Sequence, residues 1–464
     1  MKSDINYKYL FFLSLVAALG GFLFGYDTAV ISGTISDVAR IFGLDTFQQG
    51  WYVGCALVGS IVGVMFAGIL SDKIGRKLTM IVSAVLFTVS ALGCTLSPDF
   101  TMLVWFRIVG GVGIGVVSIV SPLYISEQSV AKYRGSLVSL YQLAVTIGFL
   151  GAYIVNYLLL DISNNYSFSN SIVNFIFVEE VWRAMLGMET LPALLFFVVI
   201  FIIPESSRWL ILKNKESKAR VVISKIYNSS IEVQNQIATI KEAILGEVKS
   251  DWRELLQPGV FKSVLIGSAI AILGQFMGVN AVLYYGPSIF ETSGLSGGDS
   301  LMYQVVVGLV NMLTTILALL IIDKIGRKKL IYYGVSGMII SLILISFYFV
   351  FGSCINISSF LLLAFFLLYV FSSAISICAV IFVLLSEMYP TRIRGLAMSI
   401  AGLSLWIGTY LIGQLTPWML ETISPAGTFM LFAFMCVPYI IIMWKLVPET
   451  AGKTLEEIEN FWKK

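Results

Sequence analysis

Long apolar stretches, each about the length of a membrane-spanning helix, alternate with short polar segments along the chain. Six of them fill the first half, at about 9–31, 49–70, 78–97, 102–124, 137–160 and 186–203. Six more fill the second half, at about 260–285, 301–322, 329–351, 359–385, 395–415 and 426–446. A helix needs about 20 apolar residues to cross a bilayer. The pattern therefore predicts an all-α membrane protein with twelve transmembrane helices.

Polar motifs that occur twice divide the chain into halves. The hexapeptide Asp-Lys-Ile-Gly-Arg-Lys at 72–77 returns letter for letter at 323–328. Two more pairs follow in the same order: Ser126-Glu127 and Arg134-Gly135 recur as Ser386-Glu387 and Arg394-Gly395, and Pro204-Glu205-Ser206 recurs as Pro448-Glu449-Thr450. The copies lie about 250 residues apart, which indicates two structurally equivalent six-helix halves.

The repeat and the polar stretch between its copies set the predicted boundaries. We expect an N-terminal six-helix half at 1–204, a cytoplasmic helical linker at 205–258, a C-terminal half at 259–447 and a cytoplasmic tail at 448–464. The linker is either a regulatory, partner-binding domain or a scaffold that braces the halves. We favour the scaffold, because the linker is too short for a core of its own.

Composition and charge place this chain in lipid and orient it. Hydrophobic residues make up 58% of the sequence and charged residues 12%, about half the charged fraction of soluble proteins. With a cytoplasmic amino terminus, only Arg40 and Arg183 fall in external loops and Arg107 lies within a span. The positive-inside rule then predicts an inner-membrane protein with both termini cytoplasmic. We expect the bilayer as its surroundings, no nucleic-acid partner, and function as a monomer.

The sequence offers little for enzymatic or metal chemistry. It contains no histidine, and its five cysteines are scattered without metal or redox spacing. No pairing of nucleophile and base and no phosphate-binding loop is evident. We therefore expect no enzymatic activity, no cofactor and no metal, and any proton chemistry must fall on carboxylates.

Two charged residues are predicted to lie inside the membrane at similar depth. Asp27 stands about six residues, or roughly 9 Å, from the external end of the first span. Arg107 lies at a similar depth in the fourth span. Intramembrane charges are costly and usually functional. A motion that separates the two would change the proton affinity of the carboxylate. The pair is thus a candidate for proton coupling, with a static structural salt bridge as the alternative; Glu189 is a weaker candidate near the interface, for which we favour a structural role.

The repeated charges lie at the predicted cytoplasmic ends of helices. They are Asp72, Arg76, Glu127 and Arg134 in the first half and Asp323, Arg327, Glu387 and Arg394 in the second. Ion pairs among them could lock one conformation as a cytoplasmic gate. Ordinary solvated loop charge that only sets the topology is the alternative, but repetition at equivalent places favours a geometric role.

Four longer motifs carry a family resemblance that covers nearly the whole chain. They are Gly21 to Asp27 (GFLFGYD), Asp72 to Lys77 (DKIGRK), Pro204 to Leu210 (PESSRWL) and Pro448 to Thr454 (PETAGKT). In this order the chain resembles the sugar porter family of the major facilitator superfamily, and most resembles its bacterial proton-coupled xylose and hexose symporters. The resemblance implies the major facilitator fold, and it supports the gate and the coupling role of Asp27.

Amide side chains at mid-span depth are candidates for binding a sugar, whose hydroxyl groups need hydrogen-bonding partners. They are Gln142, Gln275, Asn280 and Asn311, and interhelical hydrogen bonds are the alternative for each. The resemblance assigns sugar contacts to Gln142 and to the run from Gln275 to Asn280, followed by Tyr284 and by Trp406. Phe24 could stack on the sugar ring, and Phe382 keeps an aromatic face in the tenth span.

Several pocket positions depart from the symporter pattern. Phe149 and Gly274 stand where the family commonly has Gln, Leu405 replaces another polar residue, and Cys378 to Phe382 lack the usual Gly-Pro pair and Trp. These changes remove hydrogen-bond donors, which favours a less hydroxylated sugar or another polyol.

Taken together, the residues predict a secondary transporter that imports a monosaccharide or related polyol with a proton by alternating access. Two alternatives remain open. One is a facilitative uniporter in which Asp27 is merely structural. The other is a sugar sensor that does not transport, although the linker and tail are short for an output domain.

Overall fold

The computed structural model describes residues 5–130, 133–245, 252–352, 358–390, 393–450 and 455–462. Ala451 to Thr454 of the tail motif, Cys354 and the side chain of Asp323 lie outside the described part. The described residues form two compact units. Unit 1 comprises 5–28, 58–152 and 183–245, and unit 2 comprises 29–57, 153–182 and 252–462. We name helix ends external or cytoplasmic according to the orientation predicted from the Lys and Arg distribution.

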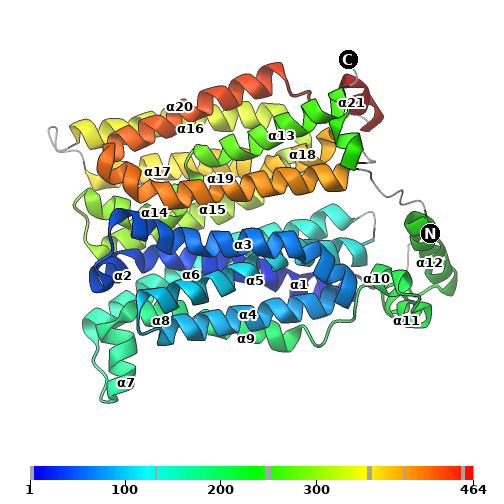
Figure 1. Ribbon diagram of the computed structural model, residues 1–464, viewed down its shortest axis with the longest axis horizontal. Coiled ribbons are helices and arrows are strands. Elements are labelled where there is room, and N and C mark those ends of the chain that lie inside the picture. Colours follow the sequence, from blue (N-terminus) through cyan, green and yellow to red (C-terminus); the bar gives the residue numbers. More distant parts are fainter. Residues whose placement is uncertain are drawn as a thin grey trace. The chain divides into compact units, whose positions relative to one another are not determined.

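Helices account for almost all of the first half (Figure 1). The helices of its six spans are α1 (Tyr7–Val30), α3 (Thr46–Ile74), α4 (Arg76–Leu96), α5 (Phe100–Gln128), α6 (Arg134–Asn165), and α8 (Val181–Gly187) with α9 (Thr190–Val199). Short external elements are the 3-10 turn Ile31–Gly33, α2 (Ile35–Phe42), α7 (Ser171–Asn174) and the π-helical turn Phe175–Glu179. The linker contributes α10 (Ser207–Leu212), α11 (Glu216–Ile226), α12 (Ser230–Leu245) and the 3-10 turn Trp252–Leu256.

The second half repeats this plan. Its spans are α13 (Pro258–Phe276) with α14 (Val279–Thr292), α15 (Gly297–Ile325), α16 (Arg327–Phe351), α17 (Ser359–Ser373) with the π-helical turn Ala374–Cys378 and α18 (Ala379–Met388), α19 (Arg394–Thr422) and α20 (Ser424–Lys445); α21 (Leu455–Trp462) lies in the tail. Twelve spans of the described chain are long and apolar enough to cross a membrane. The prediction of twelve spans is therefore confirmed.

The repeated hexapeptide gives the same backbone conformation in both halves. Gly75 (φ 101°) and Gly326 (φ 94°) each separate the end of one span from the start of the next. Residues with a side chain rarely adopt this positive φ. A Cβ at Gly75 would also lie 2.2 Å from a carboxylate oxygen of Glu205. Both the conformation and the close approach explain the glycine in the motif.

Close helix contacts in unit 1 bring α1 and α6 together. A Cβ on Gly25 would lie 2.0 Å from the carbonyl oxygen of Val145, and one on Gly148 would lie 2.1 Å from that of Phe22. Only glycine permits such an approach of two backbones in a membrane bundle. Met65, Phe66 and Ile69 of α3 are exposed, as expected for side chains that face lipid.

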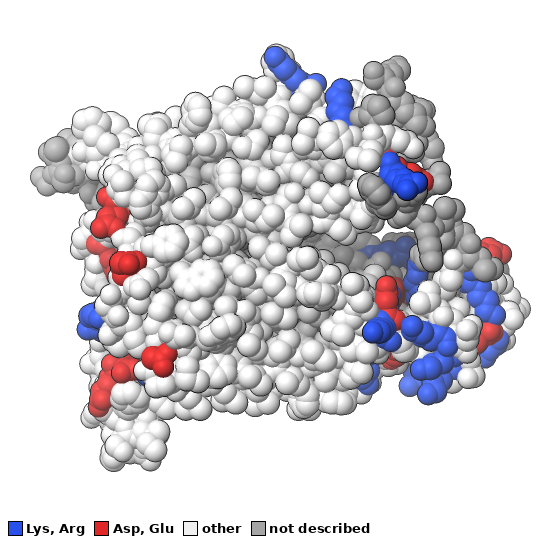
Figure 2. All heavy atoms as spheres, viewed as in Figure 1, with Lys and Arg blue, Asp and Glu red and all other residues white. Residues whose placement is uncertain are grey.

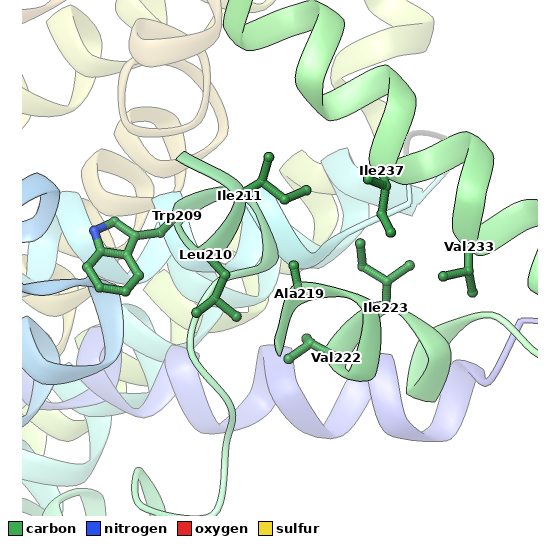
Figure 3. Close-up of a cluster of buried hydrophobic side chains, with 8 residues drawn as sticks. All are labelled: Trp209, Leu210, Ile211, Ala219, Val222, Ile223, Val233 and Ile237. Carbon is green, nitrogen blue, oxygen red and sulfur yellow. The ribbon is translucent and has the colours of Figure 1, made fainter. Parts of the chain in front are cut away.

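The expectation that the linker is too short for a core of its own is wrong, because its helices pack against one another around a small apolar core. Its members are Trp209, Leu210, Ile211, Ala219, Val222, Ile223, Val233 and Ile237 (Figure 3). Lys and Arg side chains gather around α10 to α12 (Figure 2). Near the amino terminus, Asn6 donates to the carbonyl of Ile226 at 2.8 Å, beside an antiparallel bridge between Ile5 and Tyr227. This attachment to unit 1 is consistent with the predicted scaffold.

Unit 2 contains the external ends of several first-half spans together with the second half. Ser36 donates to Glu291 at 3.0 Å, and Gln414 donates to the carbonyl of Phe47 at 2.9 Å. Thr46 is hydrogen-bonded to Glu421. The two units therefore do not follow the predicted domain boundaries at 204 and 258, which stay a prediction from the repeat. Within unit 2, the external ends of the two halves are closed against each other.

Candidate functional site

Asp27 and Arg107 form a buried ion pair in unit 1. Nη1 of Arg107 lies 2.5 Å from Oδ1 of Asp27, and the two side chains are 3% and 1% exposed, respectively. The second oxygen, Oδ2, accepts no hydrogen bond from any described residue. α1 and α5 thus bring together two residues that the sequence placed at equal depth. A buried carboxylate with one oxygen open to a proton is suited to proton binding, because removing its positive partner would leave its charge desolvated.

A second acid lies close to this pair. Glu189, immediately before α9, is 2% exposed and interacts electrostatically with both Asp27 and Arg107. The sequence interpretation placed it near the interface, and the structure adds that it is buried within unit 1. Cys94 and Ser90 of α4 line the same region, where a Cβ on Gly110 would lie 3.3 Å from Oδ2 of Asp27. Glycine at position 110 therefore leaves room for the carboxylate between α1 and α5.

The seventh span is broken between α13 and α14, at the residues predicted to bind sugar. Gly278 adopts a φ of 89° at the break. Nδ2 of Asn280 donates to Oε1 of Gln275 at 2.7 Å, and the hydroxyl of Thr409 donates to the same oxygen at 3.1 Å. The hydroxyl of Tyr369 donates to the carbonyl of Met277 at 2.7 Å, which satisfies a backbone group at the break. The two amides therefore form one preorganised hydrogen-bonding group.

The other predicted sugar-binding residues differ in their surroundings. In unit 1, Phe24 of α1 and Gln142 of α6 are partly buried on two helices that pack closely. In unit 2, Tyr284, Asn311 and Trp406 are buried. Phe382 of α18 is 50% exposed, so the structure does not bury it among other side chains. The structure joins Gln275 and Asn280 directly and leaves Phe382 outside the packed interior.

The positions that depart from the symporter pattern have apolar surroundings where the structure shows their neighbours. Phe149 is buried in unit 1. In unit 2, Gly274 faces Ile377, whose Cγ2 would lie 3.4 Å from an added Cβ. Ile377 belongs to the π-helical turn Ala374–Cys378, which directly precedes α18 and shares Cys378 with the segment that lacks the Gly-Pro pair. A π-turn is a local irregularity that occurs often at functional sites.

The predicted cytoplasmic charges of the first half form a dense cluster. Nε and Nη2 of Arg76 donate to Glu127 at 3.0 and 2.9 Å, and Nη1 donates to Asp72 at 2.9 Å. The hydroxyl of Ser206 donates to Glu127 at 2.5 Å. Glu205 accepts the backbone N–H groups of Arg76 at 3.0 Å and Lys77 at 3.2 Å. A carboxylate at these N–H groups caps the start of α4. We call Asp72, Arg76, Glu127, Glu205 and Ser206 the first cluster.

The second half builds an equivalent cluster in unit 2. Nη2 of Arg327 donates to Glu387 at 2.9 Å, and the hydroxyl of Thr450 donates to Glu387 at 2.5 Å. Glu449 accepts the backbone N–H of Lys328 at 3.2 Å and so caps the start of α16. We call Arg327, Glu387, Glu449 and Thr450 the second cluster. Each repeated Pro-Glu-Ser/Thr motif thus supplies a cap and a hydroxyl donor.

The two remaining predicted gate residues, Arg134 and Arg394, differ in their surroundings. Arg134 is exposed at the start of α6 and takes part in none of the ion pairs found among the described residues. Arg394 donates to the carbonyl of Tyr389 at 3.4 Å, beside Glu387. The sequence interpretation had not included Glu205, Ser206, Glu449 and Thr450 in the gate. Their repetition in the sequence was the signal that could have placed them there.

Comparison with known families assigns this architecture. The family described as "Sugar (and other) transporter" matches residues 13–462. The chain belongs to the sugar porter family of the major facilitator superfamily. Membership makes this sugar porter a multi-pass membrane transporter and not an enzyme, as the sequence predicted.

Curated relatives of this sugar porter cover it from end to end. It is 36% identical to the arabinose-proton symporter of Bacillus subtilis, over 98% of this chain and 95% of the relative. It is also 36% identical to the D-xylose-proton symporter of Escherichia coli, over 100% of this chain and 97% of the relative. Among solved structures, the inward-open xylose transporter XylE from Escherichia coli matches with a TM-score of 0.83 and 34% identity, over 98% of this chain and 100% of that one.

Proposed function

We propose that this protein imports a monosaccharide or related polyol together with a proton by alternating access. The buried pair of Asp27 and Arg107 carries the proposal, because a desolvated carboxylate beside one guanidinium can exchange a proton when its surroundings change. The relatives named as arabinose-proton and D-xylose-proton symporters support the same assignment. The amide pair of Gln275 and Asn280 supports a polyhydroxylated substrate.

In the proposed cycle, a proton from outside first reaches the open Oδ2 of Asp27. Neutralising the carboxylate weakens its attraction to Arg107 and permits the first-half helices to shift. Sugar hydroxyl groups bind Gln142, Gln275, Asn280 and Asn311, with Phe24, Tyr284, Phe382 and Trp406 as apolar platforms. The two six-helix halves then rotate, the cytoplasmic gate of Asp72, Arg76, Glu127, Arg134, Asp323, Arg327, Glu387 and Arg394 opens, and proton and sugar leave inside.

Substitution of the buried acid tests the coupling. In proteoliposomes with an imposed pH gradient, Asp27→Asn should abolish uphill accumulation and retain counterflow, because the amide binds no proton in this range. Asp37→Asn is a matched control, since Asp37 also pairs with an arginine, Arg40, at 2.6 Å but at the exposed surface. Uphill accumulation that survives in Asp27→Asn would show a facilitative uniporter in which this acid is structural.

The sensor alternative predicts binding without flux. Radiolabelled sugar that enters liposomes containing only this protein excludes it. The linker helices belong to unit 1 and form no separate compact unit among the described residues, which favours transport.

The substrate is proposed to be less hydroxylated than a common hexose, because Phe149, Gly274 and Leu405 bring no donors to the pocket. A thermal-shift screen of the purified protein across pentoses, hexoses, deoxysugars and inositols tests this. We expect the largest stabilisation from a deoxysugar or a polyol. Equal or larger stabilisation by glucose would contradict the proposal.

We also propose the inner membrane as the location, with both termini cytoplasmic and the monomer as the functional form. The concentration of Lys and Arg around α10 to α12 supports this orientation (Figure 2). A reporter fused to the carboxyl terminus that is active only in the cytoplasm tests it.

A further inference from the structure

A proline in the seventh span leaves one backbone carbonyl without its helical partner. Pro287 lies inside α14 and has no N–H group, so the carbonyl of Leu283 cannot receive the usual bond from four residues later. Two side chains replace the missing donor. The hydroxyl of Tyr153 donates to this carbonyl at 2.8 Å, and Nε2 of Gln304 donates at 3.2 Å.

The two donors come from different halves of the molecule. Gln304 lies on α15, next to α14 in the second half, where the absence of a side chain on Gly286 makes room for it. Tyr153 lies on α6 of the first half but belongs to unit 2 with the carbonyl it binds. Both side chains are almost completely buried. The Tyr153 bond therefore joins the two halves at the closed external end.

The same chemistry occurs a second time within the second half alone. Pro417 of α19 frees the carbonyl of Gly413, and the hydroxyl of Tyr285 donates to it at 2.6 Å. Both bonds join a tyrosine hydroxyl to a carbonyl that a proline has freed. They differ in one respect, because the Tyr285 bond links two helices of the same half.

We propose that Tyr153 is an external latch of the transport cycle, a positioning residue that holds the outer half of the seventh span closed. This inference rests on the proposed alternating access. When the external side opens, the Tyr153 bond to Leu283 breaks while Gln304 keeps the carbonyl satisfied, so that opening exposes no orphaned backbone group. The Tyr285 bond persists through the cycle because its partners move together.

Native Cys55 gives a direct readout of external opening. It is buried on α3 in unit 2, beside Gly54, whose Cβ position lies 3.0 Å from a side-chain oxygen of Gln414 in the second half. We expect a membrane-impermeant maleimide added outside to reach it only after α3 separates from α14 and α19, because Tyr285 of α14 interacts electrostatically with Cys55. The reporter background replaces the other cysteines: Cys94→Ala, Cys354→Ala, Cys378→Ala and Cys436→Ala.

Tyr153→Phe in this background should raise the labelling rate of Cys55 about two- to tenfold, the population shift that one hydrogen bond supports. Tyr369→Phe, the matched control, should leave the rate unchanged although it also loses a tyrosine hydroxyl bond to a seventh-span carbonyl, that of Met277 at 2.7 Å, within the second half. Equal rates in Tyr153→Phe and the parent, or the same acceleration in both variants, would overturn the latch. Because labelling requires neither sugar nor proton, its outcome is independent of the substrate and the coupling proposed above.

A second background distinguishes the loss of this hydrogen bond from a general loss of packing in Tyr153→Phe. Pro287→Ala restores the N–H group that the carbonyl of Leu283 lacks, and the helix can then satisfy the carbonyl by itself. On this background Tyr153→Phe should accelerate labelling less than it does beside Pro287. An undiminished acceleration would show that the proline-freed carbonyl has no part in the effect.

Discussion

The first and second clusters arise from nearly identical sequence but differ in their exposure to water. In the first cluster, the side chains of Arg76 and Glu127 are 8% and 5% exposed. In the second, those of Arg327 and Glu387 are 11% and 24% exposed. The indole N–H of Trp209 also donates to the carbonyl of Asp72 at 3.1 Å. The two halves therefore share the ion pair of these clusters, but the second cluster is more exposed to water.

The difference matters because water screens an ion pair. A buried pair that loses one partner leaves the other charge desolvated, whereas a partly exposed pair lets water replace the lost contact. We infer that the first cluster mainly holds unit 1 together and that the second is the easier one to open. The linker explains this asymmetry, since α10 follows Ser206 directly and covers the first cluster with Trp209.

The largest effect should follow removal of the two arginines. Arg76→Gln should cost about 3–5 kcal/mol of stability, because it leaves Glu127 buried without its counter-charge. Arg327→Gln should cost about 1 kcal/mol, because water reaches Glu387. Denaturant unfolding of the purified variants measures both. Equal losses would contradict the inferred difference between the clusters.

Double-mutant cycles sharpen the same comparison. The coupling energy of Arg76→Gln with Glu127→Gln should be about 2 kcal/mol or more, and that of Arg327→Gln with Glu387→Gln should be below about 1 kcal/mol. The cycle removes the general cost of each substitution. A larger coupling in the second cluster would reverse our inference about which one opens first.

The hydroxyl donors should contribute less. Ser206→Ala removes the bond to Glu127 and also the cap at the N–H of Trp209, at 3.3 Å, so a loss of about 1–2 kcal/mol is expected. Thr450→Val removes the bond to Glu387 and should cost about 1 kcal/mol. Thermal unfolding in one detergent ranks the two. A larger loss for Thr450→Val would show that burial does not govern the clusters.

The sequence predicted the fold well because its signals are local. Apolar length fixed twelve spans, and the repeated hexapeptide marked equivalent helix ends. Counting residues from the external side also placed Asp27 and Arg107 at one depth, and α1 and α5 bring them into contact. Depth along a span can be counted, since each residue of a helix adds a fixed rise.

Contacts that depend on packing between distant helices cannot be predicted by counting residues along a span. The depth of Glu189 gave no sign that this buried acid interacts with Asp27 and Arg107. The caps by Glu205 and Glu449 need a carboxylate more than 100 residues along the chain to reach a helix start. The closed external end of unit 2 depends on contacts such as Ser36 with Glu291, which no periodicity encodes.

The smallest effect concerns the cap of the first cluster and its response to pH. Burial raises the pKa of Glu205 above its ordinary value of 4.5, while the N–H groups of Ser206, Lys77 and Arg76 oppose the shift. A raised pKa in the folded protein means that this group stabilises fully below the unfolded pKa and that its contribution is lost as pH rises through the folded pKa. Glu205→Gln removes this dependence. The melting temperature of the variant minus that of the parent should therefore increase as pH rises above 4.5.

Glu216 of the linker provides the control with the opposite sign. The hydrogen bond from Lys241 lowers the pKa of this exposed carboxylate, so its contribution is present above the unfolded pKa and is lost as pH falls. The melting temperature of Glu216→Gln minus that of the parent should then decrease as pH rises. If both differences changed in the same direction, the buried cap and the exposed pair would respond to pH for a common reason, and the dry surroundings of the first cluster would not explain the behaviour of Glu205.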